Sequence, residues 1–151
     1  MNSKIKQRPR LVVSSLLAAV FIPIIATAAE VPRATFDVAN FKEAMAQVTG
    51  AAAIAESKQV SIQASSITEE ASQTHIKVVT SLPGVEQIAI FAEDNPRPLL
   101  ANFRLPKDTV SEVGARVKIQ KNTNIVAVVK ADGKFYTTKY LVKVGGRGCG
   151  G

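Results

Sequence analysis

The sequence contains little of the equipment of a conventional enzyme. Its 151 residues include no tryptophan, one histidine and one cysteine. Because His75 is the single histidine and stands at the head of a strand-like segment, it is typical of a surface residue and leaves Ser-His-Asp, Cys-His and multi-histidine sites without partners. The acidic pairs at 69–70 and 93–94 lie in loop-like segments that do not favour general acid work. We therefore expect no catalytic residue, no metal site and no cofactor.

The positive charge is concentrated at the N-terminus. The chain carries 19 basic and 12 acidic residues, for a formal charge of +7, but four basic residues and no acidic one fall within residues 1–28. The remainder carries +3 and has no run of five basic residues. Nucleic-acid binding is therefore disfavoured.

Residues 1–28 have the three parts of a secretory signal. Four basic residues precede an apolar run at 11–25, and the small residues Ala-Thr-Ala follow at 26–28. The apolar run is shorter than the roughly 20 residues of a membrane span. We expect cleavage after Ala28 or one residue later, no membrane association afterwards and a periplasmic location. Arg8 and Arg10 are not adjacent, which favours Sec export over the twin-arginine route unless the precursor travels with a partner.

One short amphipathic helix is expected after residue 40. Asn40 is a suitable N-cap, Glu43 stands at the third helical position and Gly50 ends the pattern. Between them, one apolar face is formed by Phe41, Ala44, Met45 and Val48. This face is expected to pack on the domain.

Beyond residue 58 the apolar period changes to 2, which predicts about seven strands. They fall near residues 60–64, 76–80, 88–92, 99–105, 115–119, 125–129 and 136–144. The Asp132-Gly133 pair predicts a tight type I′ hairpin. Seven short antiparallel strands indicate an all-β, immunoglobulin-like sandwich, here a single domain over residues 29–144.

The last seven residues, 145–151, form a glycine-rich segment around the single cysteine, Cys149. Such a segment buries no apolar area and is expected to act as a flexible arm, with at most about 25 Å of reach from the last strand. Arg147 favours the reactive thiolate and the terminal carboxylate opposes it. A nucleophile on a thin arm is typical of a carrier, so we expect Cys149 to be a covalent attachment point and flexibility to come from Gly145, Gly146, Gly148, Gly150 and Gly151.

Two other functions remain open for Cys149. An exported chain with one cysteine has no internal disulfide, so a structural protein that dimerises through an intermolecular Cys149 disulfide is the main alternative. A small enzyme that uses the thiol directly is weaker, because a flexible arm does not preorganise a transition state. Replacing Cys149 by Ser separates the carrier from the disulfide-linked dimer, since it abolishes carrier activity but only weakens assembly of a dimer.

The C-terminal motif resembles the SoxY family, the sulfur-carrying subunits of the periplasmic thiosulfate-oxidising system. That family ends in Gly-Gly-Cys-Gly-Gly, and residues 147–151 read Arg-Gly-Cys-Gly-Gly. Residues 125–136 are similar to its penultimate hairpin, and residues 91–99 to its Phe-Ala-x-x-Asn-Pro-x-Pro turn. The resemblance covers most of the chain after residue 28.

The resemblance implies a fold, a role and partners. The fold is an immunoglobulin-like sandwich, and a SoxZ-like subunit forms a heterodimer with it. A haem enzyme joins thiosulfate oxidatively to Cys149, a metal-dependent hydrolase releases sulfate, and in some organisms a dehydrogenase oxidises the remaining sulfur. The chain itself is then a non-catalytic carrier. Arg147 replaces a family glycine, and its cation either hinders entry into a narrow channel or pairs with the anionic cargo.

Overall fold

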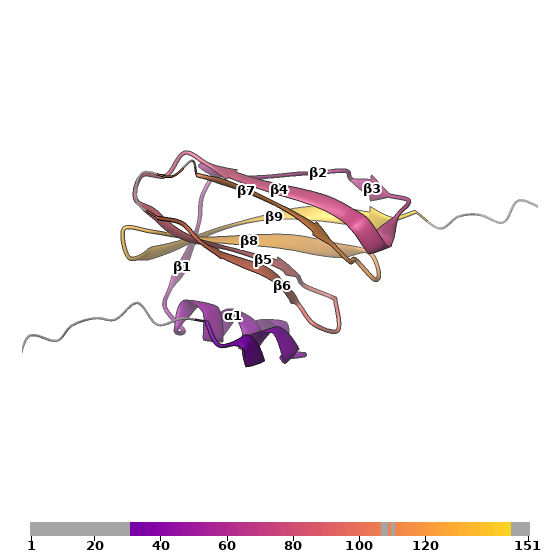
Figure 1. Cartoon of the computed structure of the whole chain (residues 1–151), viewed down its shortest axis with the longest axis horizontal. Coiled ribbons are helices and arrows are strands. Elements are labelled where there is room, and N and C mark those ends of the chain that lie inside the picture. Colours follow the sequence, from indigo (N-terminus) through magenta and orange to yellow (C-terminus); the bar gives the residue numbers. More distant parts are fainter. Residues whose placement is uncertain (1–30, 107–108, 110, 146–151) are drawn as a thin grey trace, which may run out of the picture.

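The computed structural model of the chain describes residues 31–106, 109 and 111–145 (Figure 1). The predicted signal at 1–28 and residues 146–151 of the predicted arm lie outside these ranges. Three helical segments are present, η1 (Arg33–Asp37), α1 (Phe41–Thr49) and η2 (Ala71–Gln73). The strands are β1 (Ile54–Glu56), β2 (Val60–Ala64), β3 (Ile67–Thr68), β4 (Thr74–Thr80), β5 (Val85–Ala92), β6 (Leu99–Arg104), β7 (Glu112–Val117), β8 (Thr123–Ala131) and β9 (Lys134–Val144).

The strands form two facing sheets. One has the order β1-β9-β8-β5-β6, with β3 also paired to β9, and the other has the order β2-β4-β7. All seven predicted strands are present and pair with one another antiparallel. The predicted all-β sandwich is therefore confirmed.

Two strands were not predicted, and both run parallel to β9. β1 pairs with the start of β9 and β3 with its end, on the edge that β8 leaves free. Between them the chain crosses to the other sheet as β2 and returns (Figure 1). Strands of three and two residues are too short to show a period of 2, which explains why the sequence pattern missed them.

Helix α1 begins and ends at the predicted residues. The Asn40 side chain accepts a hydrogen bond from the Glu43 backbone N–H at 3.1 Å. Gly50 adopts a left-handed conformation, φ +63°, and its N–H bonds to the Ala46 carbonyl. A residue with a Cβ is strained in that conformation, so glycine suits the helix end. Among the described residues, no helix is long and apolar enough to cross a membrane.

The apolar side chains form two clusters on opposite faces of the six-stranded sheet. The larger cluster fills the space between the sheets and contains the fully buried Ile76, Ile88, Ile90, Ile119 and Ile125. The smaller lies under α1, where Phe41 meets Phe91 edge to face at a centroid distance of 5.8 Å. Because β5 and β8 are covered on both faces, they read as continuous apolar runs.

The predicted β8–β9 hairpin turn is confirmed. Asp132 and Gly133 have φ values of +47° and +73°, as a type I′ turn requires. This turn lies at one end of the sandwich, and β9 runs from it to the other end, where the described chain stops (Figure 1).

Candidate functional site: the root of the C-terminal arm

The described chain ends at Gly145, which we call the root of the arm. Hydrogen bonds hold the last three residues from both sides. The backbone N–H groups of Lys143 and Gly145 donate to the Ser66 and Thr68 carbonyls at 2.8 and 2.9 Å. On the other edge, the N–H of Val144 donates to the Asn122 side-chain oxygen at 2.9 Å.

Gly145 also permits β3 to pass close to the root. A Cβ at this position would lie 3.3 Å from the Ile67 Cγ2 atom and 3.6 Å from the Thr68 carbonyl oxygen. The first of these distances is tighter than ordinary van der Waals contact. The glycine that was predicted for arm flexibility therefore has a packing role as well, and its N–H is fixed to β3.

Strand β3 is itself tied to the opposite sheet. The Thr74 hydroxyl on β4 donates to the Thr68 hydroxyl at 3.1 Å, and both threonines are buried. A buried polar group of this kind needs a partner to offset its lost hydration. The pair thus connects the root of the arm to both sheets of the sandwich.

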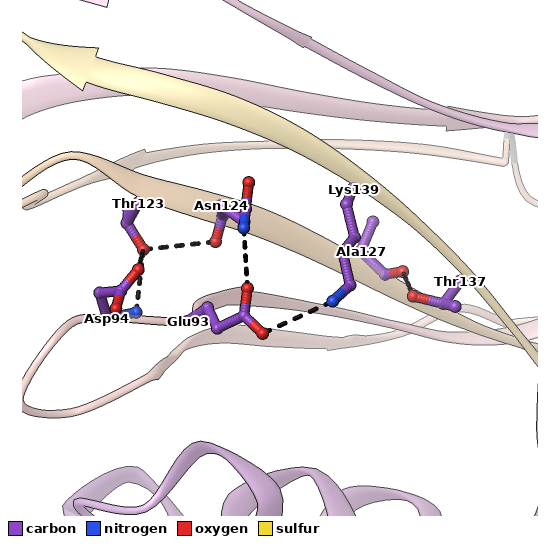
Figure 2. A network of polar contacts seen from close by, with 7 residues as sticks. All are labelled: Glu93, Asp94, Thr123, Asn124, Ala127, Thr137 and Lys139. Atoms are coloured by element: carbon purple, nitrogen blue, oxygen red, sulfur yellow. Dashed lines mark hydrogen bonds and ion pairs between the residues drawn. The ribbon is translucent and has the colours of Figure 1, made fainter.

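A polar network stiffens the neighbouring turn after β5 (Figure 2). The Asp94 N–H donates to the Thr123 hydroxyl at 2.9 Å, and that hydroxyl lies 3.2 Å from an Asp94 carboxylate oxygen. Glu93 accepts from the Asn124 amide at 2.9 Å and lies 3.5 Å from the Lys139 ammonium. These two acids thus hold strand ends together.

The surface beside the root is apolar at two positions. Ile67 and Leu141 are 60% and 50% exposed, and they are the large apolar side chains that are exposed among the described residues. Ile67 pairs with Lys143 in the ladder between β3 and β9, and Leu141 lies two residues before Lys143 on the same face. Both side chains therefore flank the place from which the arm departs.

Metal chemistry finds no support in the described part of the chain. Within it, no three His, Cys, Asp or Glu side chains lie close enough to hold a metal ion. His75 is exposed on β4, opposite Arg116 on β7, as expected of a surface strand residue.

Among the described residues, one carboxyl group has a clearly shifted pKa, and it lies away from the root. The pKa of Glu86 is below its ordinary value because Lys130 donates to its carboxylate from 2.7 Å, with a further bond from the Gly133 N–H at 3.1 Å. Burial opposes this shift but is weaker. The pair supports the β8–β9 hairpin at the far end of the molecule.

Of the predicted site residues, the structure describes only the one at the root. The structure places Gly145 in the β ladder, whereas Gly146, Arg147, Gly148, Cys149, Gly150 and Gly151 lie outside the described residues. The sequence analysis did not identify Ser66, Thr68 and Asn122, which hold the root. Their contacts join residues 22 to 77 positions apart, and no local pattern signals them.

Comparison with known proteins adds independent findings. The family model for sulfur oxidation protein SoxY matches residues 45–149, more than two thirds of the chain. The solved structure of the sulfur carrier protein SoxY from Chlorobium limicola f thiosulfatophilum has a TM-score of 0.65 and 35% identity, covering 72% of this chain and 95% of that one. No curated protein matches the chain.

A second kind of structure shares the fold alone. Superoxide reductase (neelaredoxin) from Ignicoccus hospitalis has a TM-score of 0.51 at 16% identity, covering 58% of this chain and 80% of that one. The family match, in contrast, spans the sandwich and reaches Cys149. The chain therefore belongs to the SoxY family, as its C-terminal motif predicted.

Proposed function

We propose that this protein is a periplasmic sulfur carrier that holds thiosulfate-derived sulfur covalently on Cys149 and presents it to successive enzymes. The observation that carries the proposal is the junction at Gly145. The last strand is fixed on both edges up to this residue, and the cysteine follows four positions later within the matched family region.

The length after the root fits such a role. Four residues span at most about 14 Å when fully extended. Glycines at four of the six positions 146–151 keep the segment narrow. An enzyme with a buried reaction centre can then admit the sulfur while the sandwich stays at its entrance.

The partners proposed for the cycle come from the family. A haem enzyme joins the Cys149 thiolate to thiosulfate and accepts two electrons, which leaves a disulfide-linked sulfonate on the arm. A metal-dependent hydrolase then adds water and releases sulfate, and in some organisms a dehydrogenase oxidises the remaining sulfur. A SoxZ-like subunit completes a heterodimer, and the present chain supplies no catalysis or cofactor of its own.

Two roles are proposed for the other residues of the arm. Gly146, Gly148, Gly150 and Gly151 allow passage through narrow entrances. The guanidinium of Arg147 lies two residues from the thiol and is suited to contact the anionic cargo. The boundaries 1–28 for the cleaved signal, 29–144 for the domain and 145–151 for the arm remain part of the same proposal.

Intact-mass measurement tests the carrier role directly. After exposure to thiosulfate and the haem enzyme, the purified chain should gain a sulfur adduct that a reductant removes. Cys149→Ser should gain none. An unmodified mass in the wild-type chain would contradict the proposal.

A relocated thiol provides a matched control for the arm. Ser65 is exposed in the loop between β2 and β3, so Cys149→Ser combined with Ser65→Cys keeps one thiol but places it on the folded domain. This variant should still form disulfides in air, yet it should not be loaded by the enzyme. If it were loaded as fast as the wild type, the arm would have no role in presentation.

A further inference from the structure

A cleft opens at the end of the sandwich from which the arm departs. It lies between the free edges of β6 and β7 and has a volume of about 700 Å³. One wall is the turn between β5 and β6 with the start of β6 and the end of η1, and the other is the end of β7 with the segment that follows it.

Cationic side chains dominate its lining. Arg97 comes from the first wall, and Arg116 and Lys118 come from the second. The single acid, Asp37, lies 3.4 Å from the Arg97 Nε atom. Arg116 and Lys118 have no ion-pair partner among the residues that the structure describes, so the cleft carries an excess of two positive charges.

The two walls are held at a fixed separation by Asn95. This side chain is 6% exposed, and both of its polar atoms are used. Its amide donates to the Lys118 carbonyl at 2.8 Å, and its oxygen accepts from the Gln120 N–H at 3.1 Å. The turn that carries Arg97 is thereby fixed to the segment that carries Lys118, so the backbone positions from which these cations extend are set before any ligand arrives.

The cleft is also close to the root of the arm. Gln120, in its lining, is two residues from Asn122, which holds the Val144 N–H. Two residues span at most about 7 Å. In Figure 1 the end of β7, the β5–β6 turn and the end of β9 lie at the same end of the sandwich. Cys149, with a reach of about 14 Å from Gly145, can bring its cargo to this cleft.

We infer that the cleft binds a sulfur oxyanion through its sulfonate group, with Arg116, Lys118 and Arg97 as the ligating cations. Guanidinium groups donate paired hydrogen bonds to such oxygens, and an ammonium adds charge. The choice of a sulfur oxyanion rests on the proposed function. The preference for an anion rests on the cationic lining of the cleft itself. The sulfonate has two sources, free thiosulfate or sulfate in solution and the loaded end of the arm.

A titration of the ¹⁵N-labelled exported chain, residues 29–151, tests the free anion. Sodium thiosulfate is added at constant ionic strength, with sodium chloride as the reference. The amide signals of Arg97, Arg116 and Lys118 should shift saturably, with a dissociation constant of about 1–10 mM because the charges are exposed.

A pair of double variants isolates the cleft from general charge. Arg116→Gln with Lys118→Gln should weaken binding at least about five-fold. The matched control, Lys58→Gln with Lys134→Gln, removes the same charge at exposed positions outside the cleft and should bind like the wild type. Equal binding by both variants, or shifts that sodium chloride reproduces, would overturn the inference.

Chemical loading distinguishes the two sources. Tetrathionate reacts with the Cys149 thiolate, which displaces thiosulfate and leaves a disulfide-linked sulfonate on the arm. Shifts of the three amides in the loaded chain, without free anion, identify the arm as the source. Shifts with free thiosulfate alone identify the solution anion, and shifts in neither case overturn the inference.

The result is separable from the carrier proposal. Cys149→Ser cannot be loaded but should still bind free thiosulfate in the cleft. A chain that binds thiosulfate and never gains an adduct would refute the carrier role and leave the cleft standing. A chain that is loaded normally and shows no shifts would refute the cleft alone.

Discussion

The two ends of β9 are built in different ways. At its start, Phe135 is 8% exposed and packs beneath α1, next to the tight Asp132-Gly133 turn. At its end, on the same face of the sheet, Leu141 is 50% exposed. On the face that meets α1, the first end is stabilised by buried side chains, whereas the second end is held by backbone hydrogen bonds to β3 and to Asn122 and, on the opposite face, by the buried Val142.

Along β9, the end that contributes most to stability on this face is therefore different from the end that carries the arm. Apolar burial is the main source of folding free energy, and on the face of the six-stranded sheet that meets α1 it is concentrated where the helix covers the strands. At the root of the arm, main-chain bonds fix the position while the side chains of Ile67 and Leu141 stay exposed. A carrier needs such a root, because its surroundings must meet partners and its position must not change.

The covered end should be far more sensitive to side-chain truncation than the bare end. Phe135→Ala should lower the free energy of unfolding by about 3–5 kcal/mol, because it removes a buried ring that packs beneath α1 at the start of β9. Leu141→Ala, on the same face, should cost less than about 1 kcal/mol. Urea unfolding of both variants measures the difference.

The contrast between the two ends of β9 requires that the two variants lose very different amounts of unfolding free energy. Similar losses for the two variants would mean that Leu141 is buried in solution, for example against a second molecule. Repeating the Leu141→Ala measurement at several protein concentrations tests this, because a contact between molecules makes stability depend on concentration.

Local pattern predicted the covered end well. The helix, its caps and the seven main strands follow from periods of 3.6 and 2 and from turn residues such as Asn40, Gly50 and Gly133. These features depend on residues that are neighbours in sequence. The hairpin and the continuous apolar run of β8 are likewise visible without any knowledge of distant contacts.

The root of the arm was predicted only in part. The sequence identified the glycine-rich segment and its cysteine, because their composition is unusual. It did not identify Asn122 or the parallel pairing of β3, since those contacts join segments far apart in the chain. The cationic cleft was missed for the same reason: Arg97 lies in the β5–β6 turn, Arg116 lies on β7 of the other sheet, and both look like ordinary surface residues.

Asn122→Ala should loosen the root without unfolding the domain. The Val144 N–H loses its acceptor, which costs about 1 kcal/mol locally and should speed its hydrogen exchange about 5- to 10-fold. Exchange at the buried Ile125 should not change. The control is Asn122→Asp, which keeps a side-chain acceptor and should protect Val144 as the wild type does. Unchanged exchange at Val144 in Asn122→Ala would show that water or β3 alone holds the root.

The smallest expected effect concerns the Glu86–Lys130 ion pair beside the β8–β9 hairpin, and it should appear only at acidic pH. The pKa of Glu86 lies below its ordinary value of 4.5, chiefly because of the hydrogen bond from Lys130. A lowered folded-state pKa stabilises the protein above the unfolded-state value, and this contribution is lost as pH falls through the folded-state value.

Glu86→Gln should therefore remove a small part of the stability loss seen below about pH 4.5. The side chains of Glu86 and Lys130 are 44% and 26% exposed, so solvent screening keeps the contribution of this ion pair under about 1 kcal/mol. Urea unfolding at pH 7 and pH 3 measures it, with Glu56→Gln as a control for the lost charge. The wild type should lose more stability between these pH values than Glu86→Gln. Equal losses would mean that the ion pair is too weakly held to support the hairpin, and that the turn geometry of Asp132 and Gly133 suffices there.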